Sequence, residues 1–214
     1  KERGLNLAGL RFTVQGFGKV GSWAARILQS HGAVLVAVED VTGAIAAEAG
    51  IDAEALALHV RSARGVRGFP GARPVTRAEF LSHDADVFIP AAMEDQITGI
   101  AAELLCVKLV AEGANGPTTP EGDVVLKDRG IDVIPDILCN AGGVIVSYFE
   151  WLQNRGGAAW TAQEIDRRLH EILSRAYERV RTTTASRGID RRTAAYAVAM
   201  SRLEQVYADR GIFP

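Results

Sequence analysis

Residues 12–21 read FTVQGFGKVG, a β-prone apolar run that ends in glycines spaced as G-x-G-x-x-G. An amphipathic helical pattern follows directly, so the motif has the strand–turn–helix context that it requires. In that context Gly16 permits a tight turn, Gly18 lets a pyrophosphate approach the backbone, and Gly21 lets the helix pack closely on the strand. Unpaired N–H groups at the helix start would attract the same phosphate. The motif predicts dinucleotide binding; the alternative is a glycine-rich turn in some other α/β protein.

A second strand is expected at residues 33–38, AVLVAV, which is apolar throughout, as in a parallel strand covered on both faces. The strand leads directly into Glu39 and Asp40. In dinucleotide-binding folds an acid about 20 residues beyond the glycines binds the ribose hydroxyls, and Asp40, or Glu39, fits that position. The other reading of these acids is a solvated strand end. No lysine or arginine follows before Gly43, so the two acids would repel a 2′-phosphate. The sequence therefore predicts NAD as the cofactor, with NADP as the alternative.

Strand and helix patterns alternate along most of the chain. Further strands are expected at residues 10–15, 86–90, 108–111 and 131–134, and helices at 20–31, 52–64, 76–81, 96–105, 119–129 and 140–153. Residues 65–74 are expected to form an exposed loop, and Thr76 and Thr161 each begin a capping box. From Thr161 onward the pattern is helical only, with helices at 161–187 and 191–209. The order predicts a doubly wound, Rossmann-type α/β fold with a mostly parallel sheet and C-terminal helices.

The composition restricts the function classes. The net charge of −2 over 214 residues gives no electrostatic reason for nucleic-acid or membrane binding. No apolar run is long enough to cross a bilayer, and no signal peptide is visible. Cys106 and Cys139 stand among apolar residues, which indicates buried thiols in a reducing compartment and hence a cytoplasmic protein. The four histidines have no metal-ligand spacing, so no metal site is expected: His31, His59, His83 and His170.

Several motifs occur in one order along the whole chain. They are GFGKVG (16–21), VAVED (36–40), ADVFIPAAMEDQIT (85–98), LVAEGANGPTTPEG (109–122), PDILCNAGGVIVSYFEW (135–151), RTAAYAVAM (192–200) and RGIFP (210–214). This series resembles the cofactor-binding half of a glutamate dehydrogenase, in the family that also holds leucine, phenylalanine and valine dehydrogenases. The resemblance implies oxidative deamination of L-glutamate: a hydride passes from the α-carbon to the nicotinamide, and hydrolysis of the imino acid yields 2-oxoglutarate and ammonia.

The resemblance also implies roles for individual residues. The implied cofactor contacts are Gly16, Phe17, Gly18, Lys19 and Val20 at the pyrophosphate and adenosine ribose, Asp40 at the ribose, Ala91, Ala92 and Asn115 on the nicotinamide side, and Asn140 at the carboxamide. Val144 and Ser147 lie one helical turn apart and share a face of the expected helix. In the family these positions contact the substrate side chain, and Ser147 would bind the distal carboxylate of glutamate. The competing readings are a plain loop at residues 140–143 and a serine hydroxyl bonded to its own helix.

The chain departs from the family pattern in two respects. The family usually has asparagine where Lys19 stands, and this lysine could pair with phosphate or be solvated. The family's catalytic lysine and its aspartate partner belong to an N-terminal domain whose motif does not occur here, so no catalytic residue is assigned. The expected organisation is therefore an NAD(P)-binding domain at residues 1–188 and, at residues 189–214, a C-terminal helix that packs toward the missing substrate domain. This reading treats the chain, which starts at Lys1 without a methionine, as a domain fragment.

Three functions remain open at this stage. The first is an amino-acid dehydrogenase represented by its cofactor domain, with a small-molecule substrate and a homo-hexamer as the intact enzyme. The second is a non-catalytic dinucleotide-binding or regulatory subunit of the same descent. The third is another Rossmann enzyme, such as a hydroxy-acid or folate-linked dehydrogenase, which leaves the sequence NAGGV with Ser147 behind it unexplained.

Overall fold

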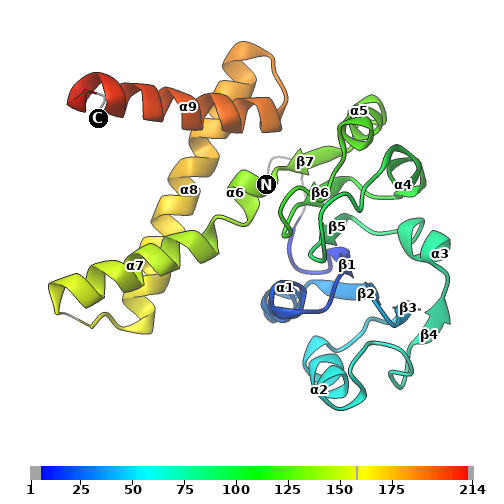
Figure 1. Ribbon diagram of the computed structural model, residues 1–214. Helices are drawn as coiled ribbons and strands as arrows, with labels where there is room; N and C mark the ends of the chain where they lie inside the picture. Colours follow the sequence, from blue (N-terminus) through cyan, green and yellow to red (C-terminus); the bar gives the residue numbers. More distant parts are fainter. Residues whose placement is uncertain (1–5, 158, 212–214) are drawn as a thin grey trace. The chain divides into compact units, whose positions relative to one another are not determined.

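Figure 1 shows the computed structural model of the chain, which describes residues 6–157 and 159–211. Its contacts divide the chain into two compact units, Lys1–Val133 and Ile134–Pro214, and each is described by itself below. This division by contacts differs from the functional division expected at residue 188, which stays a prediction.

The described residues form a seven-stranded sheet with the order β4-β3-β2-β1-β5-β6-β7 (Figure 1). Its strands are β1 (Arg11–Gln15), β2 (Val34–Asp40), β3 (Gly43–Ala46), β4 (Arg73–Val75), β5 (Val87–Pro90), β6 (Leu109–Ala111) and β7 (Asp132–Ile134). The pairs β1–β2, β1–β5 and β5–β6 are parallel, whereas β2–β3 and β3–β4 are antiparallel. Gln15 is level with Glu39 on one side and with Pro90 on the other, so the carboxyl ends of β1, β2 and β5 meet at one edge.

Helices cover both faces of this sheet, as a doubly wound fold requires. The first unit contains α1 (Lys19–Ser30), α2 (Ala53–Ala63), α3 (Arg77–Leu81), α4 (Gly99–Leu104) and α5 (Pro120–Asp128). One core packs α1 and α2 against the sheet around Phe12 and Leu35, and a second packs α3, α4 and α5 against it around Phe80 and Phe88. The side chains of Asp52, Thr76, Thr98 and Thr119 cap the starts of α2 to α5. The expected α/β fold with a mostly parallel sheet is confirmed.

The antiparallel strands β3 and β4 were not expected from the sequence. Residues 65–74 were read as an exposed loop, but Arg73 and Pro74 pair with Ala46 and Ile45 of β3. β4 has no apolar alternation, and Arg73 and Pro74 are exposed, so pattern reading had nothing to detect. Pro74 is tolerated because β4 lies at the edge of the sheet, where a missing N–H donor costs little.

The second unit is helical after the end of β7. It contains α6 (Asp136–Cys139), α7 (Gly142–Gly156), α8 (Ala162–Arg187) and α9 (Arg191–Arg210). The one-turn helix α6 before Asn140 was not expected. The buried apolar cluster of the second unit is small and consists of Leu138, Val180, Ala194 and Ala195.

The capping box expected at Thr161 is only half formed. The Thr161 side chain accepts a hydrogen bond from the backbone N–H of Glu164, as an N-cap should. The Glu164 carboxylate, however, accepts hydrogen bonds from Arg167 and Arg168 rather than from the Thr161 backbone. These two guanidinium groups lower the pKa of Glu164 to about 2, and the hydrogen bond from Arg167 has the larger effect. An arginine one turn away therefore outcompetes the backbone N–H for this carboxylate.

Cys106 and Cys139 are both exposed, so the expectation of buried thiols was wrong. Cys106 follows the fully buried Leu105, and Cys139 follows the buried Leu138. In each pair the leucine takes the inward position and its neighbour is turned outward. Within residues 6–157 and 159–211, no helix combines the length and the apolar character needed to cross a membrane.

Candidate functional site

A cavity of about 470 Å³ opens at the edge of the sheet where β1, β2 and β5 end. The chain order reverses there, because β2 and β5 lie on opposite sides of β1. Ligands of open α/β sheets bind at such a switch point, outside the carboxyl ends of the strands. The cavity lies within the first unit and is lined by Gln15, Gly16, Phe17, Gly18, Glu39, Asp40, Val41, Arg77, Ala91, Ala92, Met93 and Gln96.

In the G-x-G-x-x-G motif, Gly16 and Gly21 leave no room for a side chain, whereas Gly18 lies beside open space. Gly16 has φ = 89°, and a Cβ there would lie 2.8 Å from the carbonyl oxygen of Ala91. A Cβ at Gly21 would lie 1.8 Å from the carbonyl oxygen of Gly16, so only glycine lets α1 pack this closely on the loop. Gly18 is exposed, and a Cβ there would meet no protein atom within 4 Å. The space beside Gly18 is therefore open to a ligand.

The start of α1 faces the same edge of the sheet. Gly18 is its N-cap, and the first turn carries no acidic residue that would compete with an anion. Lys19, at the first helical position, is exposed, and its ammonium group has no partner among the residues that the structure describes. A cationic side chain and unpaired N–H groups together make this turn suited to a phosphate.

The loop after β6 lies against α1 and β5. A Cβ at Gly113 would lie 3.2 Å from Val20 Cγ1 and 3.5 Å from Ala91 Cβ. Gly113 thus brings the chain that leads to the exposed Asn115 next to the start of α1. Glu112, just before it, is completely buried and accepts a hydrogen bond from the Thr118 hydroxyl. This buried carboxylate, whose role the sequence did not reveal, fixes both ends of the loop that carries Asn115.

Asp40 organises the turn after β2. Its Oδ1 accepts hydrogen bonds from the backbone N–H of Thr42 at 2.8 Å and from the Thr42 hydroxyl at 2.5 Å. Its Oδ2 accepts from the backbone N–H of Val66 at 2.9 Å. A carboxylate has about four lone-pair sites, so these three bonds leave Asp40 about one further acceptor position. Asp40 can therefore still accept a hydroxyl hydrogen bond.

Glu39 is buried and neutralised by an arginine from a distant segment. Its side chain is 9% exposed, and its Oε2 accepts hydrogen bonds from Gln15 Nε2 at 2.8 Å and Arg77 Nη1 at 2.9 Å. Arg77 Nη2 also donates to Gln96 Oε1 at 3.3 Å. The Oε1 atom of Gln15 is buried and has no hydrogen-bond partner in the part of the chain that the structure describes. Sequence reasoning missed Gln15, Arg77 and Gln96, because they are scattered over three segments.

Asn140, Val144 and Ser147 lie in the second unit, whereas the residues that line the cavity all lie in the first. Asn140 follows α6, and its backbone N–H donates to the carbonyl of Asp136. Val144 and Ser147 are both exposed on α7. The Ser147 hydroxyl makes no hydrogen bond to any described residue, its own helix included. Their roles toward carboxamide and substrate stay predictions.

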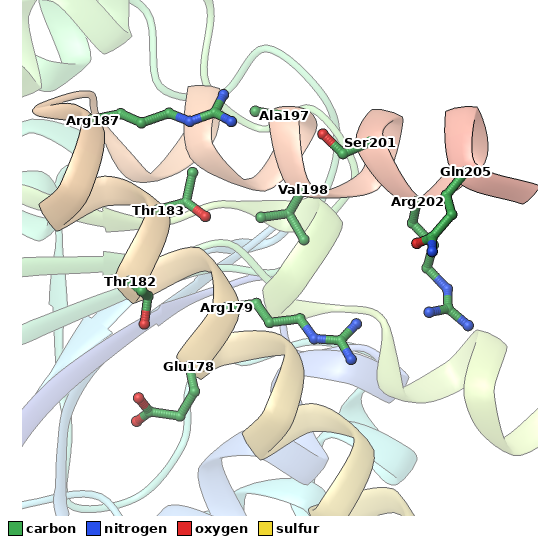
Figure 2. Close-up of a pocket in the computed structure, with 10 residues that line it drawn as sticks. All are labelled: Glu178, Arg179, Thr182, Thr183, Arg187, Ala197, Val198, Ser201, Arg202 and Gln205. Atoms are coloured by element: carbon green, nitrogen blue, oxygen red, sulfur yellow. The ribbon is translucent and has the colours of Figure 1, made fainter. Parts of the chain in front are cut away.

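A second hollow, of about 550 Å³, lies within the second unit between α8 and α9. Arg179, Arg187 and Arg202 are among its lining residues, with Glu178 beside them. Figure 2 shows that the three guanidinium groups lie well apart and do not converge on one point. Guanidinium groups that do not converge in this way do not form an anion-binding site.

Comparison with known proteins agrees with the motifs. Residues 1–211 match the model of the glutamate/leucine/phenylalanine/valine dehydrogenase family. Glutamate dehydrogenase A2 of Halobacterium salinarum is 44% identical over 202 residues, which cover 94% of this chain and 49% of that protein.

Solved structures show the same relationship. The hetero-hexameric glutamate dehydrogenase of Thermus thermophilus, in a leucine-bound form, has a TM-score of 0.92 and 30% identity over 100% of this chain and 50% of its own. The glutamate dehydrogenase of Peptoniphilus asaccharolyticus has a TM-score of 0.83 and 33% identity over 99% of this chain and 50% of its own. The chain thus spans about half the length of these relatives. It belongs to the glutamate, leucine, phenylalanine and valine dehydrogenase family.

Proposed function

We propose that this chain is the NAD-binding part of an enzyme that deaminates L-glutamate oxidatively to 2-oxoglutarate and ammonia. The observation that carries the proposal is the cavity at the switch point of the sheet, bounded by the glycine loop on one side and by the acids of β2 on the other. This is where dinucleotides bind in folds of this kind. The most similar proteins named above are glutamate dehydrogenases, which favours glutamate among the family's substrates.

The residues of the cavity fit a dinucleotide. Open space beside Gly18 admits the pyrophosphate, and the first turn of α1 with Lys19 offers N–H groups and a positive charge. The remaining acceptor position of Asp40 suits one ribose hydroxyl. Exposed apolar surface at Val41 and Met93 suits the adenine ring. The unpartnered Oε1 of Gln15 would gain a donor from a bound ligand.

The other cofactor contacts follow from the same assignment. By the family resemblance, Ala91, Ala92 and Asn115 would line the nicotinamide side, and Asn140 would hold the carboxamide. The bound nicotinamide would supply the acceptor for the substrate hydride. On α7, Val144 would contact the methylene chain of glutamate, and the Ser147 hydroxyl would donate to the distal carboxylate. Ser147 is exposed in this chain. If the bound substrate buried its hydroxyl, leaving that hydroxyl without a partner would cost roughly 1–3 kcal/mol, which would disfavour leucine.

The test is calorimetric titration of the 214-residue chain with NAD and NADP. Gly18→Ala is the informative variant, because the added methyl group meets no protein atom within 4 Å but occupies the space assigned to pyrophosphate. It should weaken NAD binding by about tenfold or more, which is about 1.4 kcal/mol, without changing the melting temperature. The control is Gly156→Ala, at a position equally free of neighbours in the last turn of α7. The proposal fails if neither cofactor binds at millimolar concentration.

A second candidate is a non-catalytic or regulatory subunit. It is favoured by the hetero-hexameric assembly of the Thermus thermophilus glutamate dehydrogenase, which combines subunits of more than one kind. By resemblance the catalytic lysine and aspartate belong to the other half, so the chain alone should show no glutamate-dependent NAD reduction. Glutamate-dependent activity of the purified chain that disappears in Asn140→Ala would contradict this expectation. For the intact enzyme we propose a cytoplasmic homo-hexamer, which size-exclusion chromatography with light scattering can check.

A further inference from the structure

Arg77 brings a guanidinium group to the wall of the cavity where β2 ends. It lies at the first position of α3, 38 residues beyond Glu39 in the sequence. The capping box between Thr76 and Glu79 holds that first turn. Its Nη1 reaches Glu39 Oε2 at 2.9 Å, and its Nη2 reaches Gln96 Oε1 at 3.3 Å. The arginine therefore shares one cavity with the glycine loop and with both acids.

This contact changes the charge that a nucleotide meets. Counted from the sequence, Glu39 and Asp40 present two negative charges and no compensating cation before Gly43. In the folded chain Arg77 forms an ion pair with Glu39, whose side chain is 9% exposed, so the three residues carry one net negative charge. Two donors of Thr42 and the backbone N–H of Val66 stabilise the remaining charge, on Asp40. Repulsion of an incoming phosphate is accordingly much weaker than the sequence indicates.

Arg77 also has donors to spare. A guanidinium has five N–H donors, and two of them are used in the bonds to Glu39 and Gln96. The side chain lines the cavity and is 49% exposed, so it has surface there to offer to a ligand. Arginine binds phosphate through paired N–H groups, and in this fold class an arginine near the ribose accommodates the 2′-phosphate of NADP.

We infer that Arg77 is a specificity-determining residue that allows the cavity to bind NADP as well as NAD. The inference rests on the proposed function, since it assigns the adenosine ribose to the end of β2. Asp40 keeps an acceptor for the 2′-hydroxyl of NAD, and Arg77 supplies donors for the 2′-phosphate of NADP. Arg77 thereby reduces the preference for NAD over NADP that the two acids predict. It also determines how large the remaining preference is.

The experiment measures dissociation constants of NAD, NADP, 5′-AMP and adenosine 2′,5′-bisphosphate on the full chain. Arg77→Gln should weaken NADP and the bisphosphate by about 10- to 100-fold, as expected for a lost charge-assisted hydrogen bond, and NAD and 5′-AMP by less than about threefold. Arg77→Lys keeps the positive charge but lacks the planar guanidinium, so its affinity for NADP should lie between those of the wild type and Arg77→Gln. The matched control is Arg73→Gln, because Arg73 lies on neighbouring β4 and pairs with Glu79 outside the cavity.

A further pair of variants guards against a folding effect. Arg77→Gln leaves the buried Glu39 without its cation, whereas Glu39→Gln with Arg77→Gln removes both charges. The double variant should retain NAD binding and still lose NADP; Glu39→Gln alone should raise NADP affinity, because Arg77 is then released from its partner. An unchanged NADP/NAD ratio in Arg77→Gln, or no NADP binding by the wild type, overturns the inference while leaving the proposed function intact. A wild type that binds neither cofactor overturns both.

Discussion

The two units of the chain bury their apolar side chains to very different degrees. In the first unit, helices on both faces of the sheet completely cover large residues such as Phe12, Phe80 and Phe88. Among the described residues of the second unit, the buried cluster consists of two alanines with Leu138 and Val180, and Phe149 of α7 is buried apart from it. The first unit is stabilised mainly by burial of apolar surface, which is the dominant favourable contribution to folding.

The helices of the second unit rely more on local interactions. Thr161 and Asp190 cap α8 and α9, and Arg167 pairs with Glu164 and Glu171 one turn away on either side. Such exposed pairs contribute little each. Large apolar side chains stay exposed along α7 and α9, among them Tyr148, Trp151, Tyr196, Met200, Leu203 and Tyr207. The comparison teaches that secondary structure can be well specified where tertiary burial is slight.

The largest expected effect sets one buried residue against one exposed residue. Phe88→Ala removes a fully buried ring from β5 and should lower the free energy of unfolding by about 3–5 kcal/mol. Leu203→Ala, at a side chain that is 58% exposed on α9, should change it by less than about 0.5 kcal/mol. Urea unfolding followed by circular dichroism measures both. Similar losses in the two variants would break the comparison.

A second comparison of the two units uses one glycine substitution in each. Gly21→Ala forces a Cβ to within 1.8 Å of the Gly16 carbonyl oxygen, so α1 must shift away from the loop. We expect a loss of about 3 kcal/mol, at the upper end of the usual range for overpacking, together with loss of NAD binding. Gly156→Ala in the second unit meets no neighbour and should stabilise α7 by up to about 1 kcal/mol. Thermal unfolding of the two variants side by side tests this, and an undisturbed Gly21→Ala protein would contradict the assigned packing.

The exposed Ser147 of α7 is a proposed substrate contact, which gives a third test. Ser147→Ala in the intact enzyme removes a hydroxyl that has no partner among the described residues, so stability should hardly change. Efficiency with glutamate should fall by about 10- to 100-fold, as for loss of one hydrogen bond to a charged group, and the gap between glutamate and norvaline should narrow. Steady-state kinetics on glutamate, norvaline and leucine measure the effect. Unchanged glutamate turnover would make the serine structural.

The smallest expected effect concerns acid. The guanidinium groups of Arg167 and Arg168 lower the pKa of Glu164 to about 2, from an ordinary value of 4.5. A lowered acid pKa stabilises the folded state above the unfolded value, and this contribution is lost as the pH falls from about 4.5 toward 2. Because Glu164 is exposed, salt should screen the effect. Helicity measured between pH 5 and 2 should fall more in wild type than in Glu164→Gln at low ionic strength, and identical curves would refute the role of the pair.

Much of the architecture could be predicted because it depends on local chemistry. The glycine spacing, the apolar run of β2 and the capping box at Thr76 each act over a few residues, and the structure places them as expected. The helices expected from residues 52 and 119 likewise begin directly after Asp52 and Thr119. The strands β3 and β4 could not be predicted in this way. β4 pairs with β3 across almost 30 residues of chain, and its exposed Arg73 and Pro74 carry no pattern. β3 has only four residues and follows β2 after a short turn, so it reads as a continuation of the preceding loop. The burial of the cysteines was misjudged for a related reason, since composition does not say which of two neighbours turns inward.

The sequence by itself determined the family, the doubly wound fold and the edge of the sheet where a dinucleotide would bind, because a short motif specifies a turn and parallel strands must end together. Only the tertiary structure decided the charge of that site. Glu39 and Asp40 are adjacent in the sequence, yet one is paired with Arg77 and the other is bonded to Thr42 and Val66. Electrostatic interactions depend on distance in space, and a cation 38 residues away in the chain comes within 2.9 Å of its partner only when the sheet and α3 have packed.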